Sequence, residues 1–207
     1  MNLSHEQIDV LKEVTNISAS RAAKQLSALL DDEIIMEIED IELLNQKQCY
    51  QLMSHDHTNA SCISQQFDGG LAGSAILLFP NEDSKLLLGS LIGKLDTIGG
   101  QDLRVLEHEA MSEIGNVIIT SSISSFADLI NVELDISIPQ YSEGEFGAIL
   151  QDKEQQSPGD ETVILLIKTR LQARNHNIAG VLIVMFSVSS AEALFSALQP
   201  SGINIVE

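Results

Sequence analysis

Two segments of this 207-residue chain, one hundred residues apart, carry the same polar pair inside the same apolar frame. The first runs from Asp9 to Ile17 (DVLKEVTNI) and the second from Glu109 to Val117 (EAMSEIGNV). In both, an acidic residue is followed by a Glu four residues later and by an Asn three residues after that. Residues three or four apart lie on one side of a helix, so each segment places a carboxylate beside a carboxamide. The pattern predicts a duplicated chain.

The closing segments of the two halves repeat as well. LAGSAILLF, from Leu71 to Phe79, corresponds to IAGVLIVMF, from Ile178 to Phe186, and a short helical pattern follows each Phe. A single helix cannot bury its apolar stripe alone, so the halves are expected to share one continuous sheet covered by helices. The prediction is one α/β domain, 1–207, made of two internal repeats of about 1–100 and 101–207.

Apolar periodicity and turn residues predict the individual elements. The capping box Ser4-His-Glu-Gln7 starts the first helix. Helices are predicted at 4–30, 86–95, 102–130 and 189–198, and strands at 34–38, 73–79, 132–138, 147–150, 163–171 and 178–186. The polar stretch 45–60 gives no clear assignment, and 152–161 is predicted to be a polar loop.

The charge balance restricts the partners of the chain. Eleven basic residues against 30 acidic ones give a net charge of −19. Nucleic acids and anionic membranes both bind through Lys and Arg, so neither is an expected partner. The longest apolar run, Ile178 to Phe186, is too short to span a bilayer. We expect a soluble, cytoplasmic, monomeric protein.

The two cysteines, Cys49 and Cys62, form no CxxC motif and no Cys/His cluster. Buried thiols are expected, with a disulfide as the alternative, and nothing requires an oxidising compartment. His55 and His57 form the one short His pair of the chain. A metal site and a plain surface location are both open for this pair, and the polar surroundings favour the surface. No metal or cofactor of its own is predicted for the chain.

At about 100° per residue, the repeated polar residues form one narrow stripe on each long helix, opposite the apolar residues. The stripes are therefore predicted to face outward, and they consist of Asp9, Glu13, Asn16 and Ser20 on the first helix and Glu109, Glu113, Asn116 and Thr120 on the second. A Glu can accept a hydrogen bond from a Lys or Arg of a partner. A neutral Asn both donates and accepts, which suits the orientation of a water molecule. Such a site has no strong nucleophile and suits a labile substrate whose own protein supplies the metal.

On these residues the chain resembles the CheC/CheX/FliY family of chemotaxis phosphatases over essentially its whole length. The family pattern is Asp or Ser, three residues, Glu, two residues, Asn, twenty-two residues and Pro. The second segment matches it at Glu113, Asn116 and Pro139, with Glu109 at the first position. Two copies in one chain are typical of the CheC type. The CheX type has one copy, and the FliY type adds a flagellar domain.

The first segment matches the same family pattern at Asp9, Glu13 and Asn16, whereas Glu39 stands at the position of the Pro. The glycines that usually surround the family Asn are reduced to Gly115 in the second copy and are absent from the first. Glycine at these positions is expected to let a partner approach closely. Pro139 leads us to expect the second copy to be at least as active as the first.

The resemblance implies a pseudo-two-fold duplicated α/β sandwich, with a shared sheet covered by two long exposed helices. It also implies hydrolysis of the phospho-aspartate of a CheY-type response regulator, which supplies the Mg²⁺. In this interpretation Glu13 and Glu113 dock the regulator, while Asn16 and Asn116 position the attacking water. The receptor deamidase CheD is a possible second partner. The alternative is a non-catalytic binding or adaptor module, serving CheD or resembling a flagellar-switch protein, and phosphate release from a phosphorylated regulator distinguishes the two.

Overall fold

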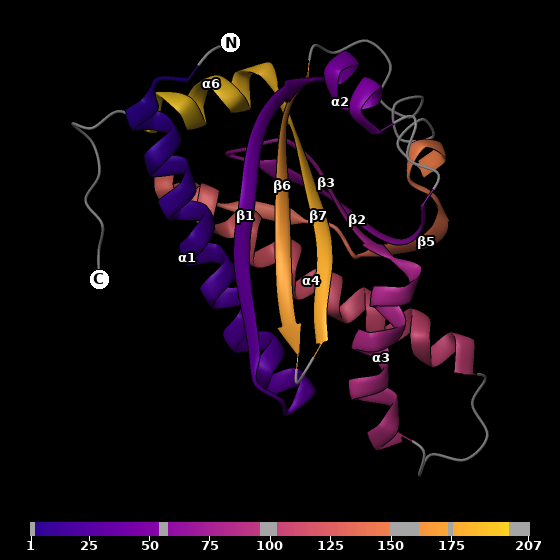
Figure 1. Ribbon diagram of the computed structural model, residues 1–207. Helices are drawn as coiled ribbons and strands as arrows, with labels where there is room; N and C mark the ends of the chain where they lie inside the picture. The colour runs from indigo at the N-terminus through magenta and orange to yellow at the C-terminus, as the bar shows by residue number, and fades with distance from the viewer. Residues whose placement is uncertain (1–2, 54–57, 96–102, 150–161, 174–175, 199–207) are drawn as a thin grey trace.

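The strands of both halves pair into one seven-stranded sheet, as the duplication predicts (Figure 1). The structure, a computed structural model, describes residues 3–53, 58–95, 103–149, 162–173 and 176–198. The strand order is β1-β6-β7-β3-β2-β4, with β5 also paired to β2. The strands are β1 (Ile34–Asn45), β2 (Asn59–Gly69), β3 (Gly73–Pro80), β4 (Leu134–Ile136), β5 (Gln140–Glu145), β6 (Thr162–Ala173) and β7 (His176–Ser187).

The strand order reads the same from either edge once the two halves are matched. In this matching β1 corresponds to β4 with β5, β2 corresponds to β6, and β3 corresponds to β7. At the centre of the sheet, Ile76 of β3 lies opposite Ile183 of β7. These two residues are 107 positions apart, which is also the separation of the repeated closing segments that begin at Leu71 and Ile178. A local two-fold axis through this pair accounts for both observations. The exact division into repeats at residue 100 stays a prediction.

Helices cover both faces of the sheet, and the larger core lies on the face of the two long helices (Figure 1). The helices are α1 (His5–Leu30), α2 (Gln46–Met53), α3 (Asn81–Leu95), α4 (Leu103–Ile130) and α6 (Val188–Ala197). The larger core contains buried side chains of α1, α3, α4 and α6. A smaller core on the other face contains Cys49 of α2 together with Phe146 and Ile149. The predicted α/β class, a shared sheet covered by two long helices, is confirmed.

The ends of the long helices follow from local sequence. The predicted capping box starts α1: the amide of Gln7 donates to the Ser4 hydroxyl at 3.2 Å, and the Ser4 amide donates to the Gln7 side chain at 2.9 Å. Both long helices end one residue before a left-handed residue, Asp31 (φ 48°) or Asn131 (φ 55°). Asp and Asn tolerate this conformation better than other non-glycine residues, and they stand one hundred residues apart, as the duplication predicts.

Several predicted elements differ from the observed ones. The predicted strand at 147–150 is wrong, because residues 146–149 are helical and bury Phe146 and Ile149 on the sheet. The predicted strand at 132–138 is reduced to the three residues of β4, and β5 follows it. The unassigned stretch 45–60 contains α2 and the start of β2. The predicted loop at 152–161 lies outside the described residues.

Strand β2 carries buried polar side chains, which hide it from apolar periodicity. Ser61, Ser64 and Gln65 are buried beside Ile63 and Phe67. Ser61 bonds with the hydroxyls of Ser84 and Tyr141, and Gln65 bonds with Asn116. Buried polar groups are tolerated where they are hydrogen-bonded, so a polar sequence can occupy an inner strand.

The membrane and disulfide questions have direct answers in the described residues. None of the described helices combines the length and apolarity that crossing a membrane requires. The thiols of Cys49 and Cys62 are buried and are not joined in a disulfide, so the alternative of a disulfide is wrong. Burial, with a smaller contribution from the Glu42 carboxylate, raises the pKa of the Cys49 thiol to about 11.

Both cysteines are therefore expected to resist thiol reagents in the folded protein. The thiolate is the reactive species, and a raised pKa keeps Cys49 protonated at pH 8. Labelling of native protein at pH 8 should be far slower than labelling in denaturant, where both thiols react. Mass spectrometry measures the labelling of each cysteine. Rapid labelling of either cysteine in the native protein would contradict the burial of that residue.

Candidate functional site

The two repeated polar pairs lie on the exposed sides of α1 and α4. Glu13 and Asn16 are exposed on α1, and Glu113 is exposed on α4, whereas Asn116 is half-buried. The opposite sides of these helices hold Leu11, Met111, Ile114 and Ile118, all buried in the larger core. The predicted outward orientation is therefore confirmed for three of the four residues, and Asn116 lies deeper than expected.

The two pairs form separate sites. The long helices contact each other in their second halves, where the Arg21 guanidinium lies 2.8 Å from the Asp128 carboxylate and 3.5 Å from the Ser125 hydroxyl. The polar pairs lie in the first halves, and Figure 1 shows the two helices starting near opposite edges of the same face of the sheet. The structure therefore does not bring Glu13 and Asn16 together with Glu113 and Asn116.

Gly115 brings α4 close to the sheet beside Asn116. A Cβ atom at Gly115 would lie 2.6 Å from side-chain atoms of Ile63 on β2, closer than two carbon atoms can pack. Gly115 is buried. The expectation that this glycine lets a partner approach closely is therefore wrong, because its missing side chain lets β2 pack closely against α4 instead. At the equivalent place, α1 has Thr15, whose hydroxyl donates to the carbonyl of Leu11 at 2.7 Å.

Close packing of α4 allows Asn116 to bond with the sheet. The side-chain oxygen of Asn116 accepts from Nε2 of Gln65 at 3.0 Å and from the Thr120 hydroxyl at 3.3 Å. Gln65 belongs to β2 and is 3% exposed. In the part of the chain that the structure describes, the side chain of Asn16 has no such partner. The two copies therefore differ: the second carboxamide is held and the first is free to turn.

The position of the family Pro coincides with an irregularity in both edge strands. In β1 the pairing with β6 shifts between Ile38 and Asp40, so Glu39 is the extra residue. In the second half, Pro139 falls between β4 and β5, and one extra residue also separates their pairings with β2. Glu39 forms an ion pair with Arg170. The bulge therefore exists with or without proline, and Glu39 does not prevent it.

The first half of α4 is fastened to β5 by an aromatic contact. The rings of His108 and Tyr141 meet edge to face, with centroids 4.6 Å apart. The Tyr141 hydroxyl donates to the Glu143 carboxylate at 2.6 Å. Burial, together with this bond, raises the pKa of Tyr141 to about 12, so the phenol stays protonated. This contact holds the segment that carries Glu109 and Glu113 against the sheet.

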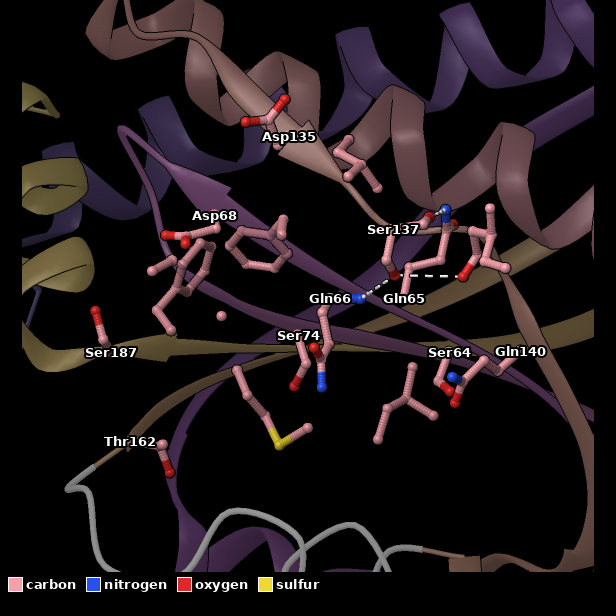
Figure 2. A pocket seen from close by; sticks show the side chains of 18 of the residues that line it. Ser64, Gln65, Gln66, Asp68, Ser74, Asp135, Ser137, Gln140, Thr162 and Ser187 are labelled. Carbon is pink, nitrogen blue, oxygen red and sulfur yellow. Dashed lines mark hydrogen bonds between the residues drawn. The ribbon is translucent and has the colours of Figure 1, made fainter.

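A cavity of about 730 Å³ opens beside β2, where β4 ends and β5 begins (Figure 2). Gln65, Gln66 and Ser137 lie side by side at one edge of it, linked by hydrogen bonds of 2.8 to 2.9 Å. Its charged lining residues, among those described, are the carboxylates Asp68 and Asp135. A phosphate group would be repelled by both, so this cavity does not suit phosphoryl chemistry. The exposed helix faces remain the candidate sites.

The described residues contain no group of three or more His, Cys, Asp or Glu side chains placed to hold a metal ion. The pair His55 and His57 lies outside the described residues, so its role is not tested.

Sequence reasoning missed the residues that surround Asn116 from the sheet. Gln65 comes from β2, which was not predicted, and Ser137 lies between β4 and β5, inside the predicted strand 132–138. Their sequence contains no motif that marks them, because Gln and Ser in a polar stretch are ordinary. The one available signal is the family pattern, in which Asn116 and Pro139 are separated by twenty-two residues. Ser137 lies within that interval, close to Pro139.

Comparison with known proteins agrees with this architecture. The model of the CheC-like family matches residues 6–37, which include Glu13 and Asn16. The CheY-P phosphatase CheC of Bacillus subtilis is 27% identical over 203 residues, covering 96% of this chain and 97% of that protein.

Solved structures share the fold. Thermotoga maritima FliY superposes with a TM-score of 0.72 at 18% identity, covering 96% of this chain and 98% of that one. The middle domain of Helicobacter pylori FliM superposes with a TM-score of 0.66 at 10% identity, covering 94% and 99%. At these identities the likeness shows the fold alone.

The contact between Gly115 and Ile63 predicts that Gly115→Ala is destabilising. Its new Cβ must displace Ile63 or move α4, which costs about 1–3 kcal/mol. Gly89→Ala is the matched control, because a Cβ at this exposed glycine of α3 meets nothing within 4 Å. Alanine there should stabilise the protein by about 0.5–1 kcal/mol. Urea unfolding measures both, and equal effects of the two changes would contradict the close packing of α4.

Proposed function

We propose that this chain, a CheC-like protein by its family match, its curated relative and its fold, is a phosphatase of a CheY-type response regulator. It would hydrolyse the phospho-aspartate of the regulator. The observation that carries the proposal is the repeated Glu and Asn pair, Glu13 with Asn16 and Glu113 with Asn116, on accessible helix faces. The B. subtilis relative, which aligns over almost the whole chain, is named a CheY-P phosphatase.

In this proposal the glutamates dock the regulator. Glu13 and Glu113 are exposed, and neither makes a side-chain hydrogen bond or ion pair with another described residue. Each carboxylate can therefore accept hydrogen bonds from a Lys or Arg of the regulator. Their position on convex helices suits a protein substrate, which brings its own concave active site.

The asparagines act on the attacking water. Hydrolysis of the acyl phosphate breaks the P–O bond as water attacks phosphorus, which releases phosphate and the free carboxylate. A carboxamide inserted beside the phosphoryl group can hold this water in line. The Mg²⁺ that neutralises phosphoryl charge would belong to the regulator. Asn16 and Asn116 therefore need no metal ligand beside them on this chain.

Two further parts of the proposal concern assembly. A monomer suffices, because each long helix carries a complete Glu and Asn pair. The deamidase CheD remains a candidate second partner without an assigned surface.

The competing function is a non-catalytic adaptor, with the fold that FliM shares. The presence of both residue types in both copies supports the phosphatase.

Loss of the asparagines should remove turnover. Asn116→Ala is expected to slow phosphate release more than Asn16→Ala, because Asn116 is held in place by Gln65 and Thr120. The double change should lower the rate by about 10²-fold or more, the usual cost of removing an oriented polar group. Release of radiolabelled phosphate from a phosphorylated CheY-type regulator measures this. A double variant with full activity would exclude the water-positioning role, and an inactive wild type would favour the adaptor.

Loss of the Glu113 charge should weaken docking rather than chemistry. Glu113→Gln removes one exposed ion pair with the regulator, which typically contributes about 0.2–1 kcal/mol. Affinity should fall and become less sensitive to salt, while single-turnover hydrolysis at saturating regulator changes little.

Glu192→Gln is the matched control, because Glu192 is exposed on α6 and the net charge changes equally. Regulator affinity at low and moderate salt is compared for the two variants. Equal weakening by both would assign the effect to overall charge rather than to a contact of Glu113.

A further inference from the structure

The orientation of Asn116 is determined by a carbonyl that lies outside the repeated motif. The main-chain oxygen of Ser137 accepts from Nε2 of Gln65 at 2.8 Å. A carbonyl only accepts, so the NH2 group of Gln65 must face it. The second hydrogen of this NH2 group goes to the side-chain oxygen of Asn116. The chain of bonds therefore turns the oxygen of Asn116 inward.

The hydrogen bonds of Asn116 leave one of its two functional groups free. Gln65 and Thr120 together occupy both lone pairs of its oxygen. The NH2 group has no hydrogen-bond partner among the described residues, and Asn116 is half-buried rather than covered. A docked molecule would therefore meet a hydrogen-bond donor at this position.

The arrangement of Gln65 is not the one that stability alone would favour. Its side-chain oxygen is buried without a hydrogen-bond partner among the described residues. A buried carbonyl without a partner is destabilising, and such groups in folded proteins call for an explanation. Orientation of Asn116 supplies one, because both donors of the same side chain are used.

The first half has no counterpart of this arrangement. The pairings with the edge strands match Gly69 with Ala173, since these residues lie opposite Leu134 and Ile34, and so match Gln65 with Thr169. The pairings with β3 and β7 match Gln65 with Ile167 instead, because these residues lie opposite Ala75 and Leu182, and the side chain of Ile167 is apolar. The hydroxyl of Thr169 donates to the carbonyl of Gly180 at 3.1 Å and is buried, so it does not reach toward α1.

We propose that Gln65 is a positioning residue of the second site, which holds Asn116 so that its NH2 group is presented to the reacting phosphoryl group. Asn116 then donates to the attacking water or to a phosphoryl oxygen. Asn16, whose side chain has no such partner among the described residues, must be oriented by the regulator itself. This inference rests on the proposed phosphatase function, and it makes the two sites unequal in preorganisation rather than in residue type.

The test measures turnover at one site at a time, in variants in which the Asn of the other site is replaced by Ala. Gln65→Met keeps the length of the side chain and removes both donors, and Gln65→Glu keeps its shape with at most one hydrogen. Each is combined with Asn16→Ala, where only the second site works, and with Asn116→Ala, where only the first works. Thr169→Val is the matched control for a polar change on the equivalent strand.

With Asn16→Ala, both Gln65 changes should lower kcat roughly three- to tenfold, the effect of one lost hydrogen bond, while regulator affinity is unchanged. In the Asn116→Ala background, neither Gln65 change should lower turnover below that of Asn116→Ala alone. Thr169→Val should have no effect on either site. Equal losses in both backgrounds would mean general destabilisation and overturn the proposal. Unchanged kcat in the Asn16→Ala background would overturn it too.

A second readout does not depend on catalysis. In NMR spectra of the free protein, the side-chain NH2 signals of Asn116 should shift on Gln65→Met and stay in place on Thr169→Val. If the Asn116 signals do not shift on Gln65→Met, the positioning role is wrong. An inactive wild type would overturn the proposed phosphatase instead, and the NMR comparison would still decide whether Gln65 holds Asn116.

Discussion

The pairing of β3 with β7 is the interaction on which the rest of the molecule depends. It joins the two halves through strands whose central residues, Ile76 and Ile183, face each other across the local two-fold axis. The halves are also interlocked, because β1 lies on β6 of the second half while β4 and β5 lie on β2 of the first. Neither half could therefore form this sheet alone, since each would expose long unpaired edges. The two sequence repeats therefore build one sheet together.

This symmetry also places the two polar pairs apart. A two-fold axis through the sheet relates α1 to α4, so motifs near the start of each helix cannot converge on a common cleft. The helices meet where Arg21 and Asp128 form their ion pair, in the second half of each. In the proposed function, a docking regulator would therefore meet one Glu and one Asn at a time, which suits a convex surface that enters the active site of its partner.

The symmetry is broken where α4 packs on β2. Gly115 allows this approach, and Gln65 then reaches Asn116, whereas Thr15 and Thr169 stand at the matching places of the first half. One sheet thus carries two copies of the same motif in different states, one oriented by the fold and one free.

The sequence alone determined the long helices, the capping box that starts α1, the shared sheet, and the outward position of Glu13, Asn16 and Glu113. These features depend on local periodicity and on the one-hundred-residue repeat, which survive as patterns in the chain. Strand β2 and the helical turn at 146–149 were not recognisable, because buried hydrogen-bonded residues such as Gln65 erase the apolar alternation of a strand. Only the tertiary structure decided which residues hold Asn116. Contacts between Gln65, Asn116 and Ser137 join positions 51 and 72 residues apart, and no local pattern specifies such a distance.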